Sequence, residues 1–265
     1  MLSLELSATW SSLYICLLSY GTSVTDFYEN RAGLDTQVLA QELKKRRKEG
    51  LFVLANFQTH GKGRQNRSWV APKNSSIFMS ICLKPTKNGR LSWIPLLTSL
   101  ALFRSLESLT TDKIKIKWPN DLVQIKNNEQ FKFSGILVEM IDEYAVVGVG
   151  INYNQKNDEL PIKNATSLKT ILSGEITKEE IIASFISEFA ALWQEENLAA
   201  VWPTNTSIRD YKKNCVTIGQ EIKAQLFDKD IIQGKAVDVL ETGELKVETG
   251  SKTVNLSSAD ITLSH

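Results

Sequence analysis

A glycine- and cation-rich segment that directly follows a short apolar run is the feature that most restricts the fold of this chain. Residues 51–56 (LFVLAN) are mostly apolar and predict a buried strand. Residues 58–69 (QTHGKGRQNRSW) then place Gly61 and Gly63 among three cations. Glycines let backbone N–H groups come close to an anion, and fixed positive charge offsets the anion's charge. The pattern predicts a strand that ends in a phosphate-binding loop.

A second polar motif, Lys117-Trp118-Pro119-Asn120-Asp121, lies about fifty residues later. It ends a run in which lysines alternate strictly with apolar side chains, so the expected strand has one wet or ligand-facing side. Proline followed by Asn-Asp turns an amide and a carboxylate outward at the strand end, where a metal–phosphate can be held. Together the two motifs predict a nucleotide that is used to activate another molecule.

The composition limits the class of protein. The chain has 265 residues, 42% of them hydrophobic, and its 31 basic and 30 acidic residues give a net charge of +1. We therefore expect no global attraction to nucleic acid or membrane, and no run reaches the ~18 apolar residues of a membrane span. Cys16, Cys82 and Cys215 form no CxxC pair, which favours buried free thiols in a reducing, cytoplasmic compartment.

Hydrophobic periodicity predicts an α+β fold with a mixed central sheet and flanking helices. Expected strands cover residues 51–56, 76–83, 113–118, 131–140 and 144–151, the last two joined as a hairpin. Expected helices cover residues 36–48, 93–109 and 177–193. Thr177 and Glu180 form a capping box at the start of the third helix.

The C-terminal part has a different pattern. Pro203 and the polar residues 204–207 mark a break after the last expected helix. Short alternating runs then cover residues 221–227, 231–240, 244–247 and 252–256, with glycines between them. Such spacing is typical of a small all-β barrel. We therefore expect a catalytic domain over residues 1–210 and a small β-domain over residues 211–265.

Four motifs, in this order, resemble those of biotin protein ligases. They are the glycine-arginine loop at 61–67, the Lys-Trp-Pro-Asn-Asp motif at 117–121, Lys132-Phe133-Ser134-Gly135-Ile136-Leu137, and the Gly-x-Gly-Ile-Asn run at 148–152. The resemblance covers roughly residues 35–263. It implies a catalytic domain similar to class II aminoacyl-tRNA synthetases and a C-terminal barrel of SH3-like type. The forty or so positions before the first expected helix do not resemble the family closely and are too few for an added DNA-binding domain, so we expect the monofunctional type.

The resemblance implies a two-step reaction. Biotin and ATP, with Mg²⁺, give biotinyl-5′-adenylate and pyrophosphate, and a lysine of a biotin carboxyl carrier protein then takes the biotinyl group. A carboxylate acylates poorly until it carries a leaving group, and bringing it to a triphosphate requires charge neutralisation. No covalent enzyme intermediate is needed, in keeping with the lack of a convincing nucleophile constellation.

The resemblance also implies roles for individual residues, with Lys132 and Arg64 as the catalytic pair. The residues expected to bind biotin are Asp35, Thr36, Gln37, Gln58, Gly61, Lys62, Gly63, Arg64, Lys132 and Gly135. Those expected to bind ATP are Arg67, Trp69, Lys117, Asn120 and Asn152, and Asp121 is expected to hold Mg²⁺.

Three positions depart from the family pattern. Asp35 stands where the family has Ser, Lys62 where it has Arg, and Asn66 where it has Gly. Lysine lacks the planar fork of arginine, so backbone N–H groups are expected to take over part of its role. Asparagine tolerates a left-handed conformation, so Asn66 is expected to replace the family's Gly with little disturbance of the backbone.

Several alternatives stay open at the level of sequence. Trp69 is equally compatible with a place in the core and with a platform for adenine. His60 is interpreted as structural because no histidine cluster accompanies it, and the basic run 44–48 as a solvated helix face. The rival functions are a lipoate ligase of related fold and a regulator that binds biotin without catalysis. A monomer and a homodimer both fit the sequence.

Overall fold

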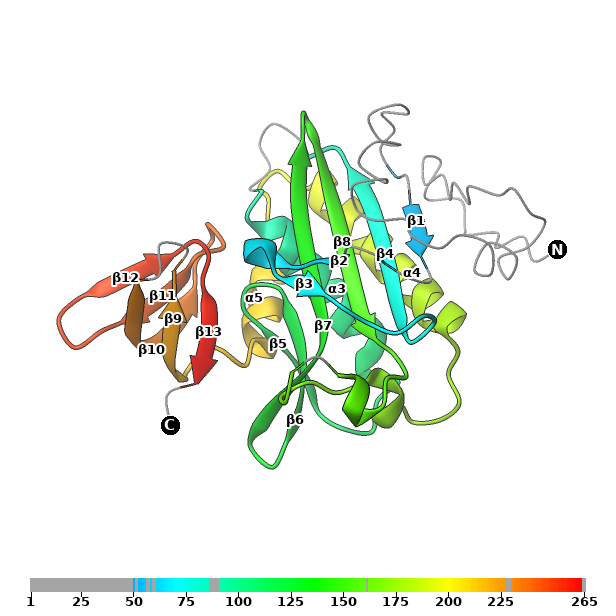
Figure 1. The fold of residues 1–265 in the computed structure, drawn as a ribbon. Coiled ribbons are helices and arrows are strands. Elements are labelled where there is room, and N and C mark those ends of the chain that lie inside the picture. The colour runs from blue at the N-terminus through cyan, green and yellow to red at the C-terminus, as the bar shows by residue number, and fades with distance from the viewer. Residues whose placement is uncertain are drawn as a thin grey trace. The chain divides into compact units, whose positions relative to one another are not determined.

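The computed structural model describes residues 50, 52–55, 58, 61–85, 91–160, 162–226 and 230–263 (Figure 1). The chain divides into two compact units. The first unit consists of Met1–Pro85 and Phe133–Ile171, and the second of Thr86–Lys132 and Leu172–His265. Each unit is therefore built from two separate stretches of the chain.

Six strands form a sheet in the order β1-β4-β8-β7-β6-β5. Their bounds are β1 Phe52–Ala55, β4 Ser76–Leu83, β5 Ile114–Lys117, β6 Asp121–Lys126, β7 Glu129–Ile141 and β8 Tyr144–Asn152. The pairs β1–β4, β4–β8, β7–β8 and β5–β6 are antiparallel. An isolated parallel bridge between Ile116 and Cys215 lies outside these strand pairs. The expected strands are thus confirmed wherever the structure describes them.

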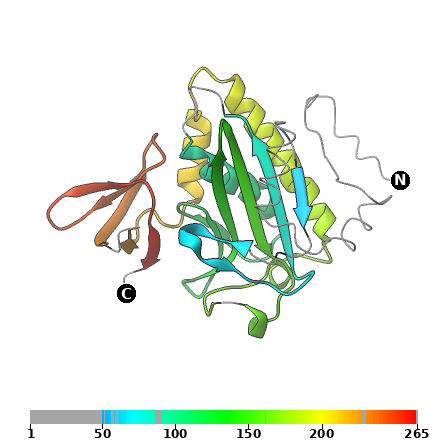
Figure 2. The same ribbon diagram turned by 45° about the horizontal axis from the view of Figure 1, so that its top comes forward.

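Strand β4 forms the centre of the first unit. Every residue of this strand is buried, Ser76 and Ser80 included, as its largely apolar sequence predicts. It pairs with β1 on one side and with β8 on the other, where Ser76 lies opposite Asn152 and Leu83 opposite Ala145. The predicted hairpin is present as β7–β8, with Asp142 at its turn in a left-handed conformation (φ 53°). Figure 2 shows these strands running side by side.

Two helices pack against each other in the second unit: α3 (Trp93–Glu107) and α4 (Lys178–Leu198). The predicted capping box of α4 is formed, because the Glu180 N–H donates to the Thr177 hydroxyl (3.2 Å) and the Thr177 N–H donates to the Glu180 carboxylate (2.8 Å). Helix α4 ends five residues later than predicted, at Leu198 rather than Trp193.

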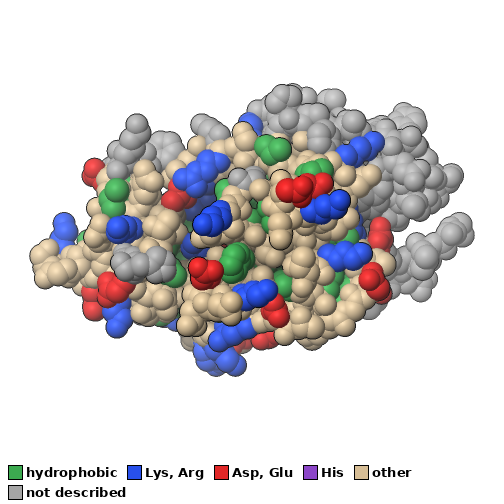
Figure 3. Space-filling model, turned by 60° about the horizontal axis from the view of Figure 1, so that its bottom comes forward, with side chains coloured by type: hydrophobic (Ala, Val, Ile, Leu, Met, Phe, Trp, Pro, Cys, Tyr) green, Lys and Arg blue, Asp and Glu red, His purple; other side chains and the backbone are tan. Residues whose placement is uncertain are grey.

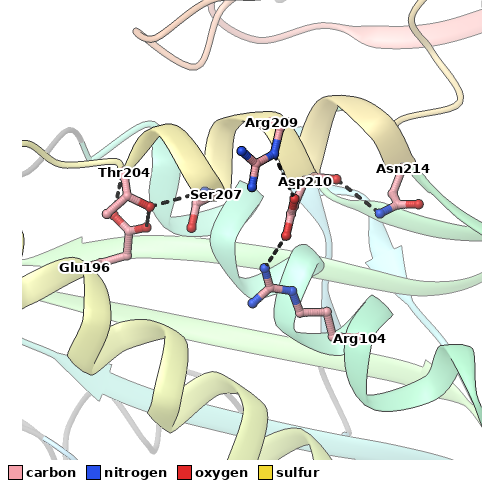
Figure 4. Close-up of polar contacts among 7 residues, drawn as sticks. All are labelled: Arg104, Glu196, Thr204, Ser207, Arg209, Asp210 and Asn214. Atoms are coloured by element: carbon pink, nitrogen blue, oxygen red, sulfur yellow. Dashed lines mark hydrogen bonds and ion pairs between the residues drawn. The ribbon is translucent and has the colours of Figure 1, made fainter.

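A further helix, α5 (Asn205–Asn214), follows where we expected only a break. Buried Glu196 of α4 accepts hydrogen bonds from the N–H and the hydroxyl of Thr204, both at 2.8 Å, and so fixes the residue that caps α5. Arg104 of α3 forms an ion pair with Asp210 of α5, with 2.7 Å between Nη2 and Oδ2 (Figure 4). The polar residues that suggested a break are therefore the start of a helix, because Thr204 is its N-cap.

The C-terminal part of the second unit is a five-stranded antiparallel sheet in the order β12-β11-β10-β9-β13. Its strands are β9 Glu221–Gln225, β10 Ile231–Val239, β11 Leu245–Glu248, β12 Thr253–Leu256 and β13 Asp260–Leu263. This confirms a small all-β region, with β13 as a strand that the sequence did not reveal. The expected domain boundary at residues 210/211 falls within α5 and stays a prediction.

Some expectations lie outside the described residues: the helix at 36–48, the motif Asp35-Thr36-Gln37, His60 and Cys16. Cys82 and Cys215 are buried free thiols, as predicted. Among the helices that the structure describes, none has the length and apolar character needed to cross a membrane. Figure 3 shows basic and acidic side chains interspersed over one face of the molecule.

Candidate functional site

The glycine-cation loop of the first unit is closed on itself by main-chain hydrogen bonds. Its two ends, β2 (Gly61–Lys62) and β3 (Ser68–Trp69), pair with each other. Between them Arg64–Asn66 forms a 3-10 turn, and the Gly63 N–H donates to the Arg67 carbonyl at 2.7 Å. The loop therefore has a defined backbone shape that carries Lys62, Arg64 and Arg67.

Trp69 explains two glycines of the predicted motifs. A Cβ on Gly61 would lie 2.4 Å from the Trp69 carbonyl oxygen and 2.7 Å from Oε1 of Gln58, closer than real Cβ contacts. A Cβ on Gly150 would lie 3.2 Å from the indole ring of Trp69. The sequence suggested that these glycines admit a ligand; the structure shows that they admit Trp69, whose side chain lies against β8. An adenine platform at Trp69 stays a prediction.

The left-handed residue of the loop is Gln65, with φ 55° and ψ 36°. The sequence did not single out Gln65 for this conformation, and Asn66, which stands where the family has Gly, follows it in the same turn. Lys62 and Arg64 are half-buried, whereas Arg67 is exposed. The cations of the loop thus differ in their access to solvent.

Two other residues of the expected biotin and ATP sets lie at the β7–β8 pair of the first unit. Gly135 lies opposite Gly150, and the neighbouring Ser134 hydroxyl donates to the Gly150 carbonyl at 2.8 Å. Asn152 is buried, and its Nδ2 donates to the Thr166 carbonyl at 3.2 Å while its Oδ1 accepts from Gln155 at 3.1 Å. The Asn152 amide therefore supports the loop after β8, and its role in ATP binding stays a prediction.

The Lys-Trp-Pro-Asn-Asp motif of the second unit is the turn between β5 and β6. Lys117 and Asp121 lie opposite each other in the register of these strands, so the turn brings both side chains to one strand end. The predicted alternation is confirmed, since Ile114 and Ile116 are buried while Lys117 is partly exposed. Asn120 is buried within the turn.

Lys132 lies next to this strand end and forms an ion pair with Asp121. Its Nζ is 2.6 Å from Oδ1 of Asp121, and the two side chains are 28% and 20% exposed. Burial lowers the pKa of Lys117; Asp121 and Asp260 raise this pKa, and Lys132 lowers it further. The second unit thus brings together three predicted residues, Lys117, Asp121 and Lys132, although Lys132 comes from a different motif.

The residues around Asp121 fit a magnesium ion that arrives with nucleotide phosphates. No group of three or more His, Cys, Asp or Glu side chains that could hold a metal occurs in the part of the chain that the structure describes. Mg²⁺ keeps several waters and is held in nucleotide sites by one or two carboxylates together with substrate phosphates. A single carboxylate with an adjacent amide, Asn120, suits that mode of binding.

Models of known protein families match both the N-terminal and the C-terminal part of the chain. The model of the "Biotin/lipoate A/B protein ligase family" matches residues 33–153. The model of the "Biotin protein ligase C terminal domain" matches residues 217–264, which contain the five-stranded sheet. The class that these two matches define is the ligases that attach biotin or lipoate to proteins.

Individual relatives narrow this class. The biotin–[acetyl-CoA-carboxylase] ligase of Mycobacterium tuberculosis is 28% identical over 80% of this chain and 79% of its own. The bifunctional ligase/repressor BirA of Bacillus spizizenii is 30% identical over 86% of this chain and 71% of its own. The solved structure of the Aquifex aeolicus biotin protein ligase in complex with biotin and ATP has a TM-score of 0.70 and 25% identity, covering 85% of this chain and 94% of that one. The chain therefore belongs to the biotin protein ligase family.

Proposed function

We propose how this biotin ligase carries out its ATP-dependent reaction. A biotin carboxylate oxygen attacks the α-phosphorus of ATP, the bond from that phosphorus to the β-phosphate oxygen breaks, and pyrophosphate leaves. A lysine amine of a biotin carboxyl carrier protein then attacks the acyl carbon of biotinyl-5′-AMP and loses a proton, and AMP leaves. The product is an amide, and no covalent enzyme intermediate forms.

The Lys132–Asp121 ion pair is the observation that best supports this proposal. Lys132 would bind the biotin carboxylate and later the phosphate that joins it to adenosine. Asp121 lies 2.6 Å from the Lys132 ammonium and so orients it before substrates bind. Fixed charge that is in place before the reaction stabilises developing negative charge without reorganisation at the moment of reaction.

The glycine-cation loop is proposed to bind biotin and retain the adenylate. Biotin would be contacted by four residues in or next to this loop: Gln58, Gly61, Lys62 and Gly63. It would also be contacted by Gly135 of β7 and by Asp35, Thr36 and Gln37, which lie outside the described residues. Arg64 would hold the closed loop over the adenylate. A mixed anhydride is hydrolysed readily, so excluding water protects it until the amine arrives.

The remaining assigned residues are proposed to bind ATP. Arg67 and Lys117 would contact phosphates, Asn120 would bind the nucleotide from the turn, and Trp69 and Asn152 would contact adenine. Mg²⁺ would be held by Asp121 and the phosphates, where it neutralises phosphate charge. The acceptor would be a lysine of a carrier protein in the cytoplasm.

A mass measurement tests the proposed function directly. A purified biotin carboxyl carrier domain incubated with the protein, biotin and MgATP is expected to gain the mass of one biotinyl group. Omitting biotin or ATP should leave its mass unchanged. Equal turnover with lipoate would overturn the assignment of the substrate, and binding of biotin without pyrophosphate release would indicate a regulator.

Arg64→Gly tests retention of the adenylate. We expect this variant to release biotinyl-5′-AMP and to label bystander lysines several-fold more than the unchanged protein, because the loop no longer excludes solvent. Lys73→Gly is the matched control, since Lys73 is an exposed cation in a neighbouring loop of the same unit. Mass spectrometry of a mixture of unrelated proteins measures the labelling. Labelling by Arg64→Gly no broader than by the control would remove this role from Arg64.

A further inference from the structure

The hairpin turn between β10 and β11 in the C-terminal sheet has an unusual set of partners. The turn is closed by main-chain hydrogen bonds, from the Gly243 N–H to the Leu240 carbonyl and from the Leu240 N–H to the Glu244 carbonyl, both at 2.8 Å. Gly243 has φ +82°, a conformation that residues with a side chain rarely adopt. The turn therefore has a defined hydrogen-bonded shape and a specific need for glycine at residue 243.

Three consecutive carbonyls of this turn accept hydrogen bonds from side chains outside the C-terminal sheet. The Trp93 indole N–H donates to the Glu241 carbonyl at 2.8 Å, and the Ser92 hydroxyl donates to the Thr242 carbonyl at 2.5 Å. The Trp118 indole N–H donates to the Gly243 carbonyl at 3.1 Å. We call residues 241–243 the docking turn.

Trp118 is the member of this set that lies in the nucleotide motif. Its side chain is 1% exposed. Its backbone N–H donates to the Thr217 hydroxyl at 3.0 Å, and the Val216 N–H donates to the carbonyl of Ile116 at 2.8 Å. The chain entering the C-terminal sheet thus lies along β5, and Trp118 is fixed at its backbone by that segment and at its ring by the docking turn.

These contacts constrain the neighbours of Trp118. Lys117 precedes it directly, and Asp121 follows three residues later on the opposing strand. A tryptophan fixed at both ends cannot tilt without breaking a hydrogen bond to a buried group, which is costly because the orphaned carbonyl has no access to water. Displacements of about 1 Å in charged groups that contact a substrate are enough to lower reaction rates strongly.

We propose that the docking turn is a positioning element for the nucleotide motif, and that Trp118 is the positioning residue through which the C-terminal sheet sets the orientation of Lys117 and Asp121. The inference rests on the proposed function, because it assumes that these two residues bind MgATP. It gives the C-terminal domain a direct part in the first step of the reaction. It also distinguishes Trp118 from Trp93, which contacts the same turn from the start of α3.

The matched pair Trp118→Phe and Trp93→Phe tests this distinction. Each change keeps an aromatic ring in a buried position and removes one indole donor to the docking turn. Trp118→Phe is expected to raise the KM for MgATP about tenfold with little change in the KM for biotin. Trp93→Phe is expected to leave both KM values close to those of the unchanged protein. Thermal unfolding of both variants shows how much stability each one loses.

Gly243→Ala tests the same coupling from the C-terminal side. A Cβ there would lie 3.1 Å from the Ser92 hydroxyl oxygen, and the backbone would be strained. Gly250→Ala is the control, because a Cβ on Gly250 meets nothing within 4 Å. We expect Gly243→Ala to raise the KM for MgATP as well, and the double variant with Trp118→Phe to add little, since both changes break one connection.

The outcomes separate the inference from the function. Equal effects of Trp118→Phe and Trp93→Phe on the KM for MgATP, or full additivity with Gly243→Ala, would overturn the inference and leave the ligase reaction intact. If Trp118→Phe does not fold, Gly243→Ala alone tests the inference. An unchanged KM for MgATP in Gly243→Ala then rejects the coupling between the docking turn and the nucleotide motif. A complete lack of pyrophosphate release by the unchanged protein would instead count against the proposed function.

Discussion

The two charged regions of this chain keep their shape by different physical means. In the first unit, the loop over residues 61–69 is fixed by main-chain pairing and by close packing of Trp69 against Gly150. In the second unit, the end of the β5–β6 hairpin is organised by charge, with Asp121 paired to Lys132 and electrostatically coupled to Lys117. Main-chain pairing and steric fit shape the loop, whereas the hairpin end, whose backbone is held by strand pairing and by Trp118, depends in addition on a balance of charges.

The difference predicts which substitutions each region tolerates. A loop fixed by contact distances should be sensitive to added volume, even when no charge changes. A strand end fixed by charge should be sensitive to the loss or titration of a cation, even when its volume is conserved. The predictions below test this contrast.

Lys132→Ala should have the largest effect. It removes the ammonium that pairs with Asp121, and adenylate formation is expected to fall by about 10²–10³-fold, the scale seen when one charge-stabilising donor is lost. Pyrophosphate release with biotin and MgATP measures the loss. Lys126→Ala is the control, because Lys126 is an exposed lysine at the end of β6. Near-normal pyrophosphate release by Lys132→Ala would refute the role of this residue.

Gly61→Ala should have the next largest effect. The added methyl group would lie 2.4 Å from a backbone oxygen, so the loop has to shift. Gly63→Ala meets its nearest atom at 3.6 Å, an ordinary contact, and should cost much less. We expect about a tenfold or greater rise in the KM for biotin in Gly61→Ala and a clearly smaller rise in Gly63→Ala. Equal effects of the two would mean that steric fit does not determine the shape of the loop.

Titration of Lys117 should change the rate of pyrophosphate release by less than the two substitutions above. Burial lowers the pKa of Lys117, so its positive charge is lost at a lower pH than in an ordinary lysine. Pyrophosphate release should therefore decline on the alkaline side as Lys117 loses its proton. Lys117→Arg keeps its charge, so the decline should move to higher pH. An unchanged alkaline limb in Lys117→Arg, with Lys126→Arg as control, would contradict this assignment.

The free energy of unfolding should change with the titration of Lys117 in the direction opposite to the change in activity. Between the lowered pKa and the ordinary value, the unfolded chain binds more protons at this residue than the folded chain does. The contribution of Lys117 to the free energy of unfolding therefore rises with pH across this window, while activity falls. Thermal unfolding across the same pH range measures this part of the prediction.

The elements whose sequences have a strong periodic pattern were predicted well. The buried run of β4, the alternation of β5, the β7–β8 hairpin and the capping box of α4 are all present. Helix α5 was missed because Thr204–Ser207 is polar, and its role as a helix start becomes clear only with Glu196 bonded to Thr204. The left-handed conformation of Gln65 was not expected, because turn geometry rather than residue type places it there.

The sequence by itself determined the motifs, their order and the family, because residue type and spacing along the chain carry that information. Only the tertiary structure decided what each motif touches. It placed Trp69 against two glycines, paired Lys132 with Asp121 and joined Trp118 to the docking turn. Residues 118 and 243 are far apart in sequence, and a contact between them is set by the folded backbone, which local pattern does not encode.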